Sequence, residues 1–183
     1  MSDWPWPPPT DDDGAAHLVP GLALPDVPLP ATTGGAVSLA QVAGRAVVFV
    51  YPYTGAPGQP NPPGWDNIPG AHGSTPEALG FRDLQSDFAA HGWQIVGLSG
   101  QTPADQSAFA ARAGLSYPLL SDIDGRIRRA LHLPVFETGG VVYLKRLTML
   151  VADGIIERVF YPVHPPERHA SDVFADIAHA RRA

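Results

Sequence analysis

Residues 46–51 read Ala-Val-Val-Phe-Val-Tyr, an unbroken run of apolar side chains that are mostly β-branched or aromatic. A strand with one solvated face alternates apolar and polar residues, whereas a strand buried on both faces reads as a continuous apolar run. We therefore predict a central strand here. The fold of this chain must cover both faces of that strand.

The segments around this run alternate between extended and helical patterns. Phe81, Leu84 and Phe88, for example, recur at helical spacing, and Asp153-Gly154 is a strong hairpin turn. The remaining expected elements are, in order, a strand at 37–39, a helix over 74–91, a strand over 93–99, a helix over 102–113, a strand over 118–121, a helix over 125–131, hairpin strands over 147–151 and 155–160, and a helix over 171–180. This order predicts an α/β, thioredoxin-like fold with a mixed central sheet and helices on both faces.

Prolines, 21 in all, concentrate before the first strand and after the central one. We predict a proline-rich arm over residues 1–21 and one thioredoxin-like domain over 22–183. Residues 52–73 form a loop too long to be a purely structural connection. Tryptophans at 4, 6 and 65 fall in these segments, and we expect them to pack together, with the arm on the loop or on a neighbouring subunit. A proline-rich ligand for another protein is the alternative.

Composition excludes several functions. The formal net charge of -6 argues against nucleic-acid binding, which needs clustered basic residues. No apolar run is long enough to span a membrane, and the first residues lack the pattern of a secretory signal, so we expect a cytoplasmic protein. The chain has no cysteine, which excludes disulfides, thiolate metal sites and thiol catalysis in this sequence.

Two helices are expected to begin with a side-chain cap. Thr102 followed by Pro103 marks the start of one. For the other, Ser74-Thr75-Pro76-Glu77 fits a capping box from Ser74 to Glu77, and Thr75 as the cap before Pro76 fits equally well. A helix N-terminus also attracts anions, so residues 73–77 are where we look for chemistry.

Other polar residues near this point have simpler interpretations. His72 lies two residues before Ser74, and such a pair could form the site of a Ser-His hydrolase. We do not favour a hydrolase because the Gly-x-Ser-x-Gly elbow is absent and no acidic partner is identifiable. His164 and His169 flank two prolines and are expected to be solvated loop histidines rather than metal ligands. Residues 122–125 start like a calcium loop, but Leu133 replaces the required glutamate, which leaves a turn with a helix cap.

Residues 47–52 and 73–83 resemble the peroxiredoxins of the alkyl hydroperoxide reductase and thiol-specific antioxidant family. Here the second stretch reads Gly-Ser-Thr-Pro-Glu-Ala-Leu-Gly-Phe-Arg-Asp. In the bacterioferritin-comigratory branch it reads Gly-Cys-Thr-Pro-Glu-Ala-Cys-Gly-Phe-Arg-Asp, so the two differences are the two cysteines. Residues 22–39, 119–122 and 145–148 are similar to further family segments, and about 22 to 179 follows the pattern.

The resemblance implies a site. Position 74 would carry the peroxidatic thiol, favoured as a thiolate by the helix N-terminus and by Arg146. The family's loop proline and threonine would fall at positions 67 and 71, where this chain has Asn67 and Ala71. Pro52 and Thr54, which follow the central strand, are expected to take their place.

Ser74 stands at the nucleophile position, and a hydroxyl cannot cycle through a sulfenic acid. Ser74 is either an introduced replacement, which we favour because the exchange is nearly isosteric, or the natural residue. Leu79 stands where the branch often keeps its resolving cysteine, which indicates a one-cysteine form resolved by an external thiol. Without the resemblance, Ser74 would be interpreted only as a helix cap and Arg146 as half of an exposed basic pair.

We therefore predict an antioxidant oxidoreductase: a peroxiredoxin-type peroxidase for hydrogen peroxide or organic hydroperoxides, here in an inactive form with Ser74. No metal or organic cofactor is implied. The expected partners are the peroxide and a thioredoxin-like protein or small thiol as reductant, with no nucleic acid or membrane and with a homodimer as a family expectation. The alternative is a naturally cysteine-free relative that serves as a non-catalytic binding module or as a repurposed small-molecule enzyme.

Overall fold

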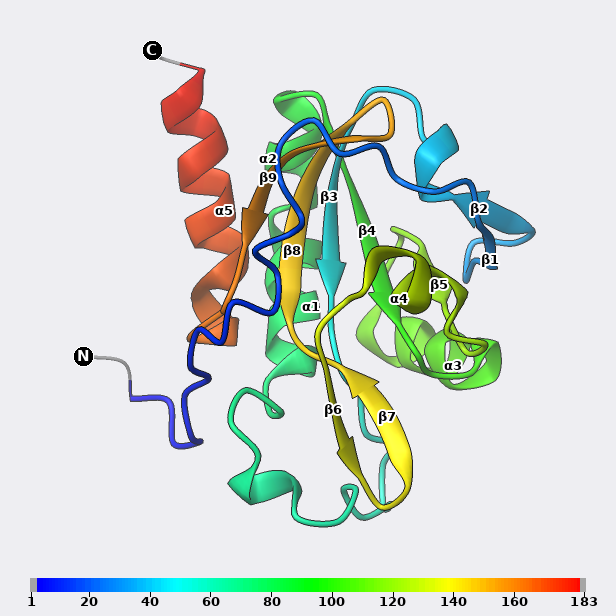
Figure 1. Ribbon diagram of the computed structural model, residues 1–183, viewed down its shortest axis with the longest axis vertical. Helices are drawn as coiled ribbons and strands as arrows, with labels where there is room; N and C mark the ends of the chain where they lie inside the picture. The colour runs from blue at the N-terminus through cyan, green and yellow to red at the C-terminus, as the bar shows by residue number, and fades with distance from the viewer. Residues whose placement is uncertain (1–2, 182–183) are drawn as a thin grey trace.

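A five-stranded mixed sheet forms the centre of the computed structural model, which describes residues 3–181 (Figure 1). The strand order is β5-β4-β3-β8-β9, in which β3, β4 and β5 are parallel and β8 and β9 are antiparallel to their neighbours. The strands are β3 (Arg45–Val50), β4 (Trp93–Ser99), β5 (Leu119–Ser121), β8 (Leu147–Ala152) and β9 (Ile155–Phe160). The apolar run forms the middle strand, and residues 46–50 are buried, as predicted.

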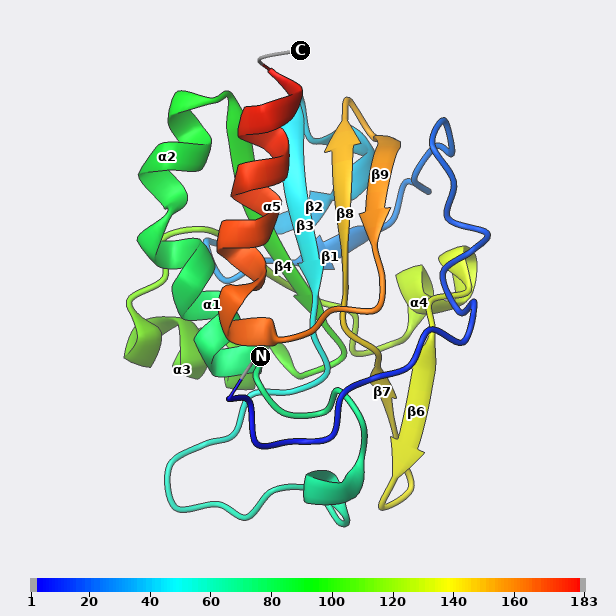
Figure 2. The same ribbon diagram turned by 90° about the vertical axis from the view of Figure 1, so that its left-hand side faces the viewer.

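Helices cover both faces of the sheet, as expected (Figure 2). One face packs against four helices through aromatic and small residues such as Phe81, Phe109 and Val173. The other packs against a single helix and the N-terminal segment, through residues such as Ile127 and Leu18. The four are α1 (Ser74–Asp83), α2 (Gln85–Ala90), α3 (Pro103–Ala113) and α5 (Pro166–Ala180), and the single helix is α4 (Arg126–Leu131).

Two small hairpins complete the fold. β1 (Pro28–Pro30) pairs with β2 (Ala36–Ser38), followed by the 3-10 turn η1 (Leu39–Gln41). β6 (Val135–Thr138) pairs with β7 (Val141–Leu144) and projects beyond the sheet beside the 52–73 loop (Figure 1). That loop contains one 3-10 turn, η2 (Trp65–Asn67).

The helix predicted over 74–91 is interrupted, and the last helix begins earlier than predicted. Leu84 separates α1 from α2. α5 begins at Pro166 because Pro165 occupies its N-cap and Pro166 its first turn, where the missing amide hydrogen has no partner to lose. Among residues 3–181, no helix combines the length and apolar character needed to cross a membrane.

The N-terminal arm lies along the domain. Its residues Ala15 and Leu18 are buried in the core, and the Gly70 amide donates to the Pro7 carbonyl at 3.1 Å. The arm therefore reaches the 52–73 loop of its own chain, which is one of the two arrangements expected for it. The boundary at residue 21 stays a prediction.

Candidate active site

The register of the sheet brings Arg146 to the loop that precedes α1. Val50 of β3 pairs with Leu147 of β8, so Arg146 stands at the carboxyl end of β3. The chain leaves β3 at this edge and returns to it at Ser74, the first residue of α1. Two residues 72 positions apart are thereby placed side by side.

Ser74 and Arg146 are both buried, with 3% and 4% of their surfaces exposed. Arg146 Nη2 lies 3.2 Å from Ser74 Oγ. The same nitrogen points toward the carbonyl oxygens of Gly70, Ala71 and His72, at 3.5, 3.3 and 3.2 Å. The guanidinium thus ties the end of the loop to the first turn of the helix and places a positive charge at the side chain of residue 74.

Glu77 balances this charge from inside the helix. Its carboxylate accepts from Arg146 Nη1, and the side chain is fully buried. Burial raises the pKa of Glu77 to about 7, although Arg146 opposes the shift. The pair is a positioning device, because a carboxylate at this place fixes the guanidinium that faces Ser74.

Neither predicted cap forms at α1. Gly73 is the N-cap residue, with φ of 113°, and it receives no side-chain cap. Ser74 and Glu77 make their bonds to Arg146 rather than to the helix amides, and Thr75 is exposed. The capping interpretation was therefore wrong for both. A sequence signal for Glu77 existed, because it falls four residues before Phe81, on the buried face of the helix.

Aromatic residues surround the outer side of Ser74. The Trp6 ring stacks on His72, with ring centroids 3.7 Å apart and planes at 11°. Trp65 is buried against Tyr53 and the β6–β7 hairpin. Together with Trp4 these residues line a hollow of about 230 Å³ that opens above Ser74. All three tryptophans line this hollow and the arm supplies part of its wall, whereas their packing on one another stays a prediction.

The Redoxin family profile matches residues 20–177 of this chain. The chain belongs to the Redoxin family. It is 29% identical over 158 residues to a chloroplastic peroxiredoxin Q of Gentiana triflora, covering 86% of this chain and 65% of the relative.

Solved structures agree with this family assignment. Peroxidoxin BcpB of Mycobacterium tuberculosis superimposes with a TM-score of 0.71 at 28% identity, covering 89% of this chain and 98% of the other. The bacterioferritin comigratory protein of Xanthomonas campestris, solved in work on its alkyl peroxide reduction activity, gives 0.69 at 28%, covering 88% and 99%. The thioredoxin-like fold and the resemblance to this branch are confirmed.

In this chain Thr54 is hydrogen-bonded to Gln101 rather than to Ser74. Its amide and hydroxyl both donate to Gln101 Oε1 at 3.0 Å, and its carbonyl accepts from Gln101 Nε2 at 3.1 Å. Pro52 is buried two residues after the end of β3. The role expected for Pro52 and Thr54 beside position 74 stays a prediction, whereas Ser74 and Arg146 are brought together.

His72 does have an acidic partner, contrary to the expectation from the sequence. Its Nε2 lies 2.8 Å from Asp66 Oδ1, six residues earlier in the loop. A hydrolase is still not favoured, because Ser74 Oγ is held by Arg146. The interaction instead links His72, at the end of the 52–73 loop, to η2.

His169 is the prediction that failed most clearly. It lies on α5, is 5% exposed, and its Nε2 is 2.8 Å from Thr148 Oγ1. Burial lowers its pKa to about 3, with Arg146 adding to the shift. His164 is exposed, as predicted. Asp122 caps α4 by accepting from the amides of residues 127 and 128, which confirms the turn-and-cap interpretation.

The charged groups around position 74 are suited to holding an anion. Within residues 3–181 no group of three or more histidines and carboxylates lies close enough to hold a metal ion. What the arrangement offers position 74 is a buried guanidinium and the first turn of a helix, both of which favour negative charge.

Proposed function

We propose that the hollow above Ser74 is a peroxiredoxin peroxidase site that the serine silences. The observation that carries the proposal is the contact between Ser74 Oγ and the buried Arg146 guanidinium at the first turn of α1. The Redoxin relatives, named as peroxiredoxins, support the same activity.

A cysteine at position 74 would act as a thiolate nucleophile. Its sulfur attacks one oxygen of the peroxide, so an S–O bond forms, the O–O bond breaks, and water or an alcohol leaves after taking up a proton. The sulfur is oxidised to a sulfenic acid while the peroxide is reduced. Arg146 contributes by stabilising the thiolate and the negative charge on the departing oxygen.

The reducing electrons have to come from another molecule. Leu79 occupies the position of the family's resolving cysteine, and the chain contains no other thiol. A thioredoxin-like protein or a small thiol would therefore reduce the sulfenic acid through a mixed disulfide. A hydroxyl has a far higher pKa than a thiol and forms no sulfenic acid, so the chain with Ser74 does not turn over peroxide.

Peroxide consumption by Ser74→Cys, measured with a thiol reductant, tests the proposal. The control is Ser171→Cys, which puts a thiol on the exposed side of α5. We expect turnover of hydrogen peroxide or cumene hydroperoxide by Ser74→Cys alone. Equal rates in the two variants, or none in either, would overturn the proposal and favour the cysteine-free binding module or repurposed enzyme. Cytoplasmic location and a homodimer stay predictions, and size-exclusion chromatography tests the second.

A further inference from the structure

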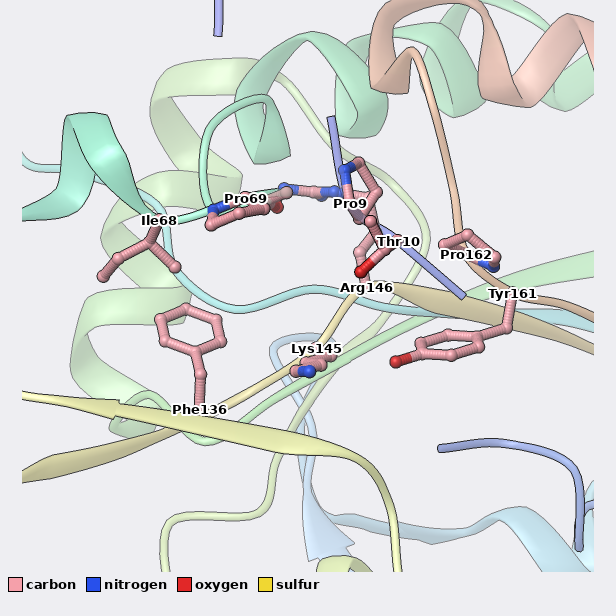
Figure 3. A pocket seen from close by; sticks show the side chains of 10 residues that line it. Pro9, Thr10, Ile68, Pro69, Phe136, Lys145, Arg146, Tyr161 and Pro162 are labelled. Atoms are coloured by element: carbon pink, nitrogen blue, oxygen red, sulfur yellow. The ribbon is translucent and has the colours of Figure 1, made fainter. Parts of the chain in front are cut away.

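A second pocket, lined in part by Arg146, lies between the arm and the β6–β7 hairpin (Figure 3). Its volume is about 170 Å³. That is below the roughly 300–1,000 Å³ of pockets for drug-sized molecules, so it fits a ligand of a few heavy atoms. Ser74 and the tryptophans do not line it.

One part of its wall is apolar and the other part donates hydrogen bonds. The apolar part consists of Pro9, Ile68, Pro69, Phe136 and Pro162. Figure 3 shows the Phe136 ring facing Ile68, with the Lys145 amine and the Tyr161 hydroxyl pointing toward the middle. Lys145 is the only lysine among the 183 residues.

The donor groups already hold a carboxylate, that of Asp12 on the arm. Lys145 Nζ and Tyr161 Oη each donate to it at 2.6 Å, and the Gly14 amide donates at 3.0 Å. These bonds, the one from Lys145 first, hold the pKa of Asp12 well below its usual range. The geometry is therefore complementary to an ionised carboxylate.

Arg146 adds a second positive charge to the wall. It lines the pocket and is 4% exposed. The charges of Arg146 and Lys145 are balanced by Glu77 and Asp12, so an incoming anion has to replace Asp12 rather than join it.

We propose that this pocket binds a small aliphatic carboxylate. Its oxygens accept from Lys145 Nζ and Tyr161 Oη, the two side-chain donors that now hold Asp12, and its hydrocarbon chain lies against Phe136, Ile68 and the prolines. Asp12 is the built-in competitor. Its side chain is 42% exposed, so the carboxylate can turn to solvent when the ligand arrives.

Calorimetric titration of the full chain with hexanoate tests the proposal, with hexanamide as the neutral control of the same shape. We expect hexanoate alone to bind. Lys145→Gln should weaken it about tenfold, as for the loss of one charge-assisted hydrogen bond. Asp12→Asn should tighten it, because the competitor is gone, and Phe136→Ala should weaken it.

Trp6→Ala separates this pocket from the hollow above Ser74, since Trp6 lines only the latter. Hexanoate binding that depends on Trp6 and not on Lys145 would place the ligand in the hollow and overturn the proposal. Equal binding of hexanoate and hexanamide, or of neither, would do the same.

A second test uses the unmodified chain and therefore does not depend on the folding of any variant. Acetic anhydride modifies exposed amines, and peptide mapping isolates the peptide with Lys145, whose side chain is 34% exposed. We expect hexanoate to slow this modification severalfold and hexanamide to leave it unchanged. No protection by hexanoate would contradict the assignment.

Discussion

Two helices of this protein begin with the same pattern, a Ser or Thr followed three residues later by an acidic residue, and use it for different purposes. At α3, Thr102 Oγ1 accepts from the Asp105 amide at 3.1 Å, and Asp105 is exposed. At α1, Ser74 and Glu77 are buried and both bind Arg146. The pattern stabilises the helix in one place and builds a site in the other. What differs is the surroundings, since only α1 starts opposite a buried cation.

The largest expected difference concerns the two acidic residues. Above the pKa of Glu77, Glu77→Ala leaves the Arg146 charge buried without a partner and should lower the free energy of unfolding by about 3–5 kcal/mol. Asp105→Ala removes an exposed charge from a first turn and should cost less than about 1 kcal/mol. Urea denaturation of both variants measures this, and equal losses would mean that Glu77 is only a helix-start residue.

The next largest difference is expected between two glycines, Gly73 before α1 and Gly114 after α3. A Cβ on Gly73, at φ of 113°, would lie 2.1 Å from Pro166 Cγ, so Gly73→Ala should cost about 2–5 kcal/mol from backbone strain and overpacking together. Gly114, after α3, is also left-handed but has open space around it. Gly114→Ala should therefore cost only about 1–2 kcal/mol. A Gly73→Ala variant as stable as Gly114→Ala would contradict the close packing of α1 against α5.

Glu77 also gives α1 a pH dependence. Its pKa is raised from 4.5 to about 7, so between these values the folded chain holds a proton that the unfolded chain has released, and stability falls as pH rises. His169, with a pKa lowered from 6.5 to about 3, has the opposite effect, since stability falls as pH drops below 6.5. Each is worth at most about 1.4 kcal/mol per pH unit.

Between about pH 4.5 and 6.5, the free energy of unfolding of Glu77→Gln should therefore rise more steeply with pH than that of the parent chain. In the same range, the free energy of unfolding of His169→Gln should fall as pH rises. Thermal unfolding across this range measures both slopes, with Asp105→Asn as the exposed control. If both variants kept the slope of the parent chain, the protonation states assigned to this site would be wrong.

The smallest difference separates two Thr-Pro pairs. Thr102→Ala removes a real cap and should cost about 1 kcal/mol. Thr75→Ala changes an exposed residue without a capping role and should stay within about 0.5 kcal/mol. A larger loss for Thr75→Ala than for Thr102→Ala would show that Thr75, and not Gly73, is the N-cap residue of α1 in solution.

Most of the central sheet could be predicted because its strands are short, apolar and followed by clear turns. Trp93–Ser99 was predicted to the residue, and the Asp153-Gly154 hairpin formed where expected. The β6–β7 hairpin was missed because residues such as Val135 and Val141 are exposed and its strands pack on the 52–73 loop, a contact that no local pattern contains.

The site was half predictable. Ser74 and Arg146 came from the family resemblance, and the structure joins them. Glu77 was assigned to a local cap because its real partner lies 69 residues away. The sequence predicts a solvated loop for His169 because prolines inside a helix break it, whereas Pro165 and Pro166 stand at the start of α5.

The central claim is that the start of α1, with Arg146, activates a thiol placed at position 74. The most direct test is the rate at which hydrogen peroxide oxidises the single thiol of Ser74→Cys, compared with Thr102→Cys at the start of α3. We predict that Ser74→Cys reacts at least about a hundredfold faster, the scale expected of a preorganised charge at a reacting group. Equal rates would show that the buried arginine contributes nothing to peroxide chemistry and would contradict the account.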